Sequence, residues 1–206
     1  MLIHEWDAST DDTEWRAFVA THGFGDLVAG GRERDLPVVV PTQFVLSGDE
    51  VLLHLVRNNP IWSAIDENPN VLLCVAGDWA FIPSSWKVVG EEDPAYGIPT
   101  TYYAAVQIEG RATVMREPDE VAAVLRVQLG ALQPEERVVD PSEHGPRLKA
   151  ITGMRIEITA VRAKFKYGGN VDRAHRAAVA EHLAERDGPG DAAALAQLTR
   201  RLEAGS

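Results

Sequence analysis

Six short β-rich runs separated by turn residues constrain the fold of this chain more than any other feature. They cover residues 26–31, 38–46, 51–56, 71–82, 104–114 and 154–166. No strand–helix–strand unit repeats between them, as a parallel sheet would require. The pattern therefore predicts a mainly β fold with peripheral helices, either an antiparallel barrel or a sandwich, and the small barrel is favoured.

The two runs nearest the C-terminus carry the most informative patterns. Between Ala104 and Val114 apolar and polar residues alternate, which indicates a strand with one buried and one solvated face. In the run 154–166 the apolar positions shift from even to odd numbers, so a β-bulge is expected near residues 160–162. Three cations fall on one face of this strand: Arg162, Lys164 and Lys166.

Helical periodicity and helix-end signals predict helices outside these runs. The expected helices cover residues 11–22, a short stretch after Pro60, and residues 117–132, 172–187 and 191–204. A polar loop is expected between residue 132 and about residue 147.

Charge and composition exclude several classes of function. The formal net charge is −11, whereas a nucleic-acid-binding surface is normally basic, so direct DNA binding is not expected. The sequence has no apolar run of membrane-spanning length and does not begin with a signal peptide. Cys74 is the single cysteine, so no disulfide can form within the chain. These features predict a cytoplasmic protein without a membrane segment.

Motifs for metal binding, nucleophilic catalysis and common nucleotide sites are missing. None of the six histidines lies in an HExxH motif, and one cysteine cannot build a thiolate site, so no metal centre is predicted. Ser84 and Ser85 lack the GxSxG context of a nucleophile elbow. The GGRER segment at residues 30–34 lacks the glycine spacing of a phosphate-binding loop.

Residues 57–59 are the best candidates for holding an anion. Arg57, Asn58 and Asn59 lead from a strand into the short helix near Pro60, whose first N–H groups and dipole favour negative charge. A structural role is the alternative. In that case Arg57 pairs with a surface carboxylate, and the two asparagines cap the helix.

Two further segments contain hydroxyl groups and aromatic rings. They are SSW at residues 84–86 and PTTYY at residues 99–103. Such side chains can hydrogen-bond and stack on a flat ligand. The alternative is again structural, with the aromatic side chains filling the core.

Several motifs occur in a characteristic order. They are HGFGDLVA (22–29), LHLVRNNPIW (53–62), VAGDWAFIPSSW (75–86), GIPTTYYAAV (97–106) and ITGMRIEITAVRAKFKYGGN (151–170). Over roughly residues 22–179 the chain thereby resembles the PaiB-like family of FMN-binding negative transcriptional regulators, whose patterns read HPFGxLV, GHxARANPQW, AYxSPSWY, VPTWNY and KFKLSQN. The chain differs inside three of these patterns, with PSSWK at residues 83–87, IPTTYY at residues 98–103 and KFKYGGN at residues 164–170.

The resemblance implies a fold and a cofactor. The expected fold is a six-stranded antiparallel split β-barrel, which forms a homodimer and binds FMN at the subunit interface. The barrel domain would cover residues 1–170, including the N-terminal helix, and a helical extension would cover residues 171–206. The expected partners are therefore FMN and a second copy of the chain.

The resemblance also implies which residues bind FMN. It places Arg57 and Asn58, with Asn59 beside them, at the phosphate, because a guanidinium fork can grip two phosphate oxygens. Ser85, Trp86, Thr100 and Tyr103 are expected to line the ribityl chain or the ring. Three more residues are expected beside the flavin or at the dimer contact: Lys164, Lys166 and Asn170.

The resulting expectation is an FMN-binding split-barrel protein of the PaiB-like regulator family. Two alternatives stay open. One is a flavin-dependent oxidoreductase that acts on an unknown small molecule, with FMN carrying the redox chemistry. The other is a dimeric interaction or sensor domain that has no cofactor. The sequence does not decide whether the protein is an enzyme.

Overall fold

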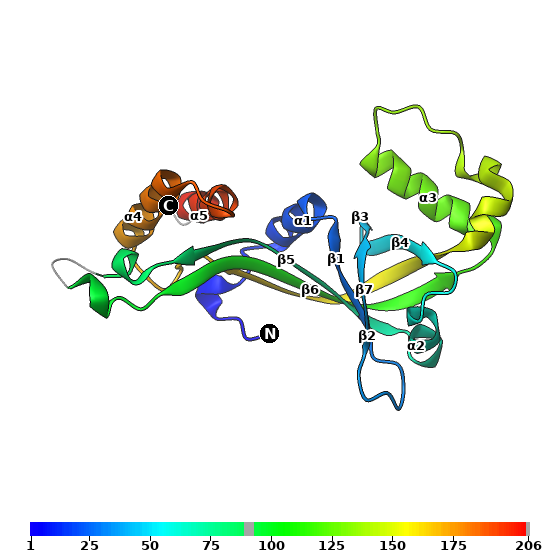
Figure 1. The fold of residues 1–206 in the computed structure, drawn as a ribbon, viewed down its shortest axis with the longest axis horizontal. Helices are drawn as coiled ribbons and strands as arrows, with labels where there is room; N and C mark the ends of the chain where they lie inside the picture. The colour runs from blue at the N-terminus through cyan, green and yellow to red at the C-terminus, as the bar shows by residue number, and fades with distance from the viewer. Residues whose placement is uncertain (89–92, 205–206) are drawn as a thin grey trace. The chain divides into compact units, whose positions relative to one another are not determined.

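The computed structural model describes residues 1–88 and 93–204, and it is mainly antiparallel β-sheet with helices, as predicted (Figure 1). The helices are α1 (Asp12–Thr21), α2 (Ile61–Glu67), α3 (Pro118–Leu132), α4 (Arg173–Arg186) and α5 (Asp191–Ala204). The strands are β1 (Phe24–Ala29), β2 (Val38–Gln43), β3 (Val45–Ser47), β4 (Glu50–Val56), β5 (Asn70–Ile82), β6 (Thr100–Met115) and β7 (Ile151–Lys166). Four 3₁₀ segments are η1 (Glu5–Asp7), η2 (Ser84–Trp86), η3 (Pro94–Tyr96) and η4 (Pro141–Ala150). Within the described residues, no helix is both long enough and apolar enough to span a bilayer.

One sheet has the strand order β2-β1-β5-β6-β7-β4-β3, so the described residues form seven strands where six were predicted. The additional strand arises because the predicted run 38–46 is divided at Phe44. On one side of this residue β2 pairs with β1, and on the other side β3 pairs with β4. Phe44 itself is buried, and its N–H donates to the Gly23 carbonyl at 3.0 Å. Phe44 thus joins the two edge strands, β2 and β3, which do not pair with each other within the described residues, so the sheet is not closed.

The chain divides into two compact units. Unit 1 consists of Met1–Glu14, Ala76–Val106 and Ala163–Ser206, and unit 2 consists of Trp15–Val75 and Gln107–Arg162. Residues 89–92 and 205–206, which include the end of the predicted extension, lie outside the described residues. Strands β5, β6 and β7 each contribute residues to both units.

The core of unit 2 follows the alternation that the sequence predicts, because successive side chains of a strand point to opposite faces. Its buried apolar residues include Leu27, Phe44, Val51, Leu53, Leu73, Val75, Ile108, Met154 and Ile156. These side chains form the apolar core of unit 2.

Helix α3 begins where its sequence signals place it. Glu117 and Glu120 form a reciprocal capping box at its first turn. The buried face of the helix includes Val121, which packs in one cluster with Leu148 of η4. This contact explains why residues 141–147 form part of a 3₁₀ segment where a polar loop was predicted, since burial of Leu148 holds the segment against α3.

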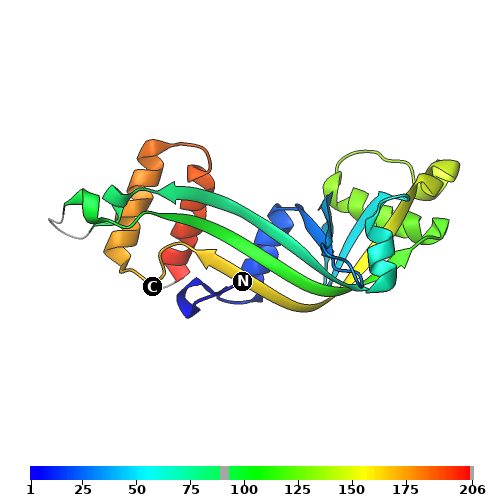
Figure 2. The same cartoon turned by 60° about the horizontal axis from the view of Figure 1, so that its bottom comes forward.

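In unit 1, helices α4 and α5 lie side by side in both views (Figures 1 and 2). The two helices bury apolar side chains, among them Val179 and Leu183 of α4 and Leu198 of α5. Arg186 at the end of α4 donates two hydrogen bonds to Asp191 at the start of α5, with N–O distances of 2.7 and 2.5 Å. This ion pair links the two helices of the predicted extension.

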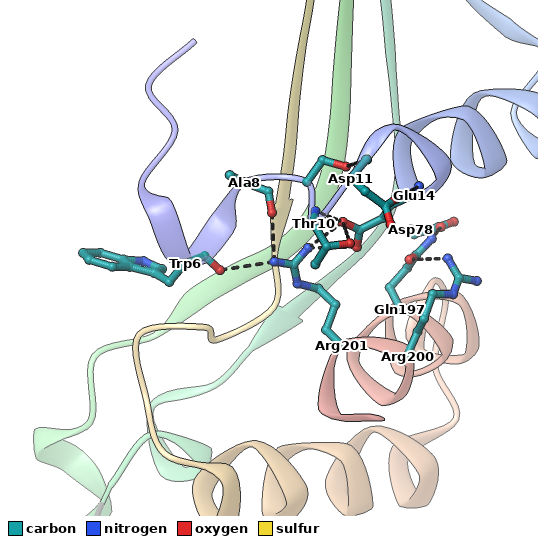
Figure 3. Close-up of polar contacts among 10 residues, drawn as sticks. Trp6, Ala8, Thr10, Asp11, Glu14, Asp78, Gln197, Arg200 and Arg201 are labelled. Atoms are coloured by element: carbon teal, nitrogen blue, oxygen red, sulfur yellow. Dashed lines mark hydrogen bonds and ion pairs between the residues drawn. The ribbon is translucent and has the colours of Figure 1, made fainter. Parts of the chain in front are cut away.

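A second ion pair joins α5 to the N-terminal segment of unit 1 (Figure 3). Arg201 Nη1 donates to both carboxylate oxygens of Glu14, at 2.8 and 3.0 Å. Arg201 Nη2 donates to the carbonyl oxygens of Trp6 and Ala8, at 3.3 and 3.0 Å. Glu14 also accepts from the backbone N–H of Thr10 at 2.7 Å. The Arg201 and Glu14 side chains are only 12% and 6% exposed, so water solvates neither charge well. Each charge is therefore stabilised mainly by the other.

Candidate functional site

A cavity of about 740 Å³ lies in unit 1. This volume is within the range of small-molecule and cofactor sites. Four of the predicted cofactor-binding residues line it: Thr100, Lys164, Lys166 and Asn170. Its other lining residues come from the N-terminal segment, from residues 87–102 and from the start of α4: His4, Trp6, Asp7, Lys87, Tyr96, Gly97, Ile98, Pro99, Tyr102, Gly168, Val171 and His175.

The cavity is basic although the chain is strongly acidic. Three of the four lysines in the sequence line it, namely Lys87, Lys164 and Lys166. Lys164 Nζ lies 3.8 Å from the Asp7 carboxylate and donates to the Leu2 carbonyl at 3.1 Å. Neither of the other two lysines forms an ion pair with a carboxylate within the described part of the chain. The cavity therefore presents uncompensated positive charge, which favours an anionic ligand.

Lys166 is positioned to contact a ligand in this cavity. Its ammonium donates to Thr100 Oγ1 at 2.7 Å and lies 5.9 Å from the centre of the Tyr103 ring. Burial, and secondarily the charge of Lys166, lowers the pKa of Lys87 below its ordinary value. A negative group between the two ammonium groups would relieve this repulsion.

Aromatic rings add flat apolar surface to the same cavity. The rings of His4 and Trp6 stack with centroids 4.7 Å apart and an interplanar angle of 10°. Trp6 and Tyr96 both remain exposed. Aromatic faces of this kind can stack on a planar heterocycle.

Three buried polar atoms of unit 1 have no hydrogen-bond partner within the described residues, and two of them belong to residues that line the cavity. They are Tyr102 Oη, His175 Nε2 and Arg176 Nε. Buried polar groups in proteins are nearly always hydrogen-bonded, so unpaired ones at a cavity point to a ligand. Together with the lysines and aromatic rings, they give the cavity a donor set that fits a flat molecule with polar edges and a negative charge, as FMN is.

Tyr102 and Gly168 stand at positions where the chain differs from the motif patterns given above, and they contact each other. Gly168 has φ +74°, and a Cβ built on it would lie 2.3 Å from Tyr102 Oη. A side chain at position 168 would therefore collide with the tyrosine. The glycine at position 168 leaves the space that the tyrosine at position 102 occupies, so these two differences from the family patterns fit each other.

The predicted phosphate-binding residues lie in unit 2. Arg57 and Asn58 are exposed. Arg57 forms no ion pair with a carboxylate in the described residues, and its Nη1 lies 3.5 Å from the Lys149 carbonyl. Asn59 accepts the N–H of Ile61 at 3.0 Å. Asn59 thus caps α2, which corresponds to the structural alternative for this residue, whereas the guanidinium of Arg57 is available to an anion.

Ser85 and Trp86 lie on η2 in unit 1 and are not among the residues that line the cavity. Trp86 stacks on His182 with centroids 5.0 Å apart, and the Arg186 guanidinium lies 4.5 Å from its ring centre. This tryptophan therefore packs η2 against α4.

The sequence did not single out Lys87, His175 or Arg176, and it indicated Tyr102 only as part of the PTTYY segment. The scarcity of lysine was a usable signal for Lys87, because three of only four lysines fall in or next to the quoted motifs. His175 and Arg176 lie in DRAHRAAV (172–179), which follows the last quoted motif and belongs to the same resemblance, but nothing in that segment indicates where the helix packs.

Comparisons with known proteins identify relatives and a shared fold. Residues 1–160 match the family model described as "Putative FMN-binding domain". Over 206 residues the chain is 26% identical to "Protease synthase and sporulation protein PAI 2" of Bacillus subtilis (strain 168), covering 96% of each protein. Two solved structures show the same fold at low identity. The flavocytochrome Anf3 of Azotobacter vinelandii has a TM-score of 0.64 and 20% identity over 82% of this chain and 73% of that one. The FAD and heme binding protein of Mycobacterium smegmatis has a TM-score of 0.61 and 18% identity over 84% of this chain and 79% of that one.

Proposed function

The chain belongs to the PaiB-like FMN-binding domain family, and from this premise we propose that it binds FMN in the basic cavity of unit 1. The gathering of three of the chain's four lysines around one cavity carries this proposal. FMN, when bound, supplies electron- and hydride-transfer chemistry, while the protein supplies binding, orientation and electrostatics. The lysines, Thr100 and Asn170 would hold the cofactor by hydrogen bonds and charge.

The first test is whether the purified protein binds FMN. We expect quenching of flavin fluorescence on titration with the protein, saturating at one FMN per chain. The same titration tests the alternative in which the protein is an interaction or sensor domain without a cofactor. Absence of binding at high FMN concentration would support that alternative and reject the proposal.

Arg57 and Asn58 are proposed to bind the FMN phosphate, as the family resemblance implies. The support is that the Arg57 guanidinium is exposed and has no carboxylate partner in the described residues, so it can meet a phosphate without breaking an ion pair.

The Arg57→Ala variant tests the phosphate assignment. It should bind FMN roughly 10- to 100-fold more weakly, because a hydrogen bond to a charged group is worth about 1.5–3 kcal/mol. Riboflavin, which lacks the phosphate, should bind the variant and the natural protein equally well. The control is Arg111→Ala, an exposed β6 cation outside the proposed site. Unchanged FMN affinity of Arg57→Ala would remove this residue from the site.

We further propose that the protein is a cytoplasmic homodimer whose sheet forms a split barrel. Unit 1 presents Trp79 and Phe81, alternate residues of β5 that are 57% and 52% exposed. Large apolar side chains exposed on one strand face are typical of an interaction surface. A molar mass of a single chain, measured by light scattering on the flavin-loaded protein, would contradict the dimer.

A further inference from the structure

On the premise that FMN binds in unit 1, we propose that the C-terminal extension recognises the imide edge of the flavin ring. The residues are Tyr102 of β6 together with His175 and Arg176 of α4. Helix α4 lies beyond residues 1–160, which the family model matches. The extension would therefore supply part of the cofactor's recognition site.

The inference starts from three buried atoms without partners: Tyr102 Oη, His175 Nε2 and Arg176 Nε. Tyr102 is 1% exposed, and both it and His175 line the cavity. A buried polar atom without a partner is unfavourable, so the two in the cavity lining, with that of Arg176 next to the lining residue Gly168, indicate that a ligand completes their hydrogen bonds.

Tyr102 and Arg176 lie on either side of Gly168, and Tyr102 and His175 line the same cavity. A Cβ built on Gly168 would lie 2.3 Å from Tyr102 Oη and 3.4 Å from Arg176 Cγ, so both groups border the same point. His175 precedes Arg176 in the first turn of α4, where the Asp172 side chain accepts its backbone N–H at 2.8 Å. The glycine and the helix cap together fix the position of this polar group.

The protonation of each group defines what it offers a ligand. One ring nitrogen of His175 hydrogen-bonds to the Trp86 backbone, and burial lowers the pKa of this histidine, so the neutral ring offers Nε2 as an acceptor. Burial raises the pKa of Tyr102 to about 12, so its hydroxyl keeps its proton and can donate. Arg176 Nε can only donate. The set therefore contains two donors and one acceptor.

The imide edge of a flavin has the complementary set. Its two carbonyl oxygens, at C2 and C4, accept hydrogen bonds, and the N3–H between them donates. Tyr102 and Arg176 would donate to the carbonyl oxygens, and His175 Nε2 would accept from N3–H. A fully ionised phosphate has no hydrogen for His175 Nε2, so the set favours an imide over a simple anion. A uracil nucleotide carries the same edge and is the other possible source of this chemistry.

The experiment compares the affinities of FMN and N3-methyl-FMN, whose methyl group removes the donor. The natural protein should bind the methylated flavin at least roughly tenfold more weakly. His175→Leu should bind FMN more weakly and lose this discrimination, whereas His144→Leu in unit 2 should keep it. Equal affinity of the natural protein for both flavins, or full discrimination by His175→Leu, would overturn the proposal.

Tyr102→Phe provides a second variant in case His175→Leu does not fold. It removes only an unpartnered hydroxyl, so the protein without ligand should melt no lower than the natural one, yet bind FMN several-fold more weakly. Unchanged FMN affinity of this variant would count against the imide site.

Uridine monophosphate separates this proposal from the proposed function. Binding of uridine monophosphate but not FMN, lost in His175→Leu, would reject the FMN function and retain the imide site. Binding of neither ligand would reject both, and binding of FMN without N3 discrimination would reject the imide site alone.

Discussion

Replacing Arg201 with methionine is expected to lower the free energy of unfolding by about 3–5 kcal/mol, because it leaves the buried Glu14 carboxylate without its cation. The guanidinium makes bonds to Glu14 and to the carbonyl oxygens of Trp6 and Ala8, all of which the substitution removes. Urea denaturation followed by circular dichroism measures the effect.

An exposed ion pair serves as the control for Arg201. Arg155 and Glu50 lie 3.6 Å apart with side chains 43% and 41% exposed, so Arg155→Met should cost less than about 1 kcal/mol. The double substitution Glu14→Leu with Arg201→Met should recover part of the loss, because no buried charge is then left unpaired. A cost for Arg201→Met as small as that of Arg155→Met would show that the pair does not hold α5 in place.

Replacing Lys166 with methionine is expected to weaken both FMN and riboflavin binding roughly 10- to 100-fold, since a charge-assisted hydrogen bond is worth about 1.5–3 kcal/mol. The loss should extend to riboflavin because Lys166 is proposed to lie beside the ring rather than the phosphate. The protein without ligand should change little in stability, because the lost hydrogen bond to Thr100 Oγ1 is offset by the removal of a like charge next to Lys87. Fluorescence titration and thermal melting measure the two effects.

Lys149 is the matched control for Lys166, as it is the one lysine outside the cavity lining and it is exposed. Lys149→Met should leave riboflavin affinity unchanged. If Lys166→Met lost affinity for FMN alone, the lysine would have to contact the phosphate, contrary to the assignment. A large fall in melting temperature would instead indicate a structural role.

Local signals explain why much of the fold was predictable. The helical spacing of apolar residues between residues 117 and 132 placed α3, and the alternation between Ala104 and Val114 placed β6. Both patterns depend on residues only a few positions apart, so they can be recognised without knowledge of tertiary contacts. The seventh strand was not predictable in this way, because the change of pairing partner at Phe44 depends on which strands lie beside it.

The residues of the candidate site likewise divide into those that motifs predicted and those whose surroundings only the structure shows. Thr100, Lys164, Lys166 and Asn170 were predicted from motifs, and the structure brings them to one cavity. Whether these residues bind FMN stays a prediction, as does the role of Arg57 and Asn58. Trp86 was predicted from the same motifs but packs against α4.

The sequence by itself determined the family, the mainly antiparallel β architecture and the flavin expectation, because motif order and residue periodicity are properties of the chain alone. Only the tertiary structure decided that Lys87 joins Lys164 and Lys166, that Tyr102 and His175 line the same cavity, and that Arg176 borders it at Gly168. The physical reason is that these residues are brought together by the pairing of long strands and by the packing of α4 and α5. Contacts of that kind join distant parts of the chain and leave no local pattern in the sequence.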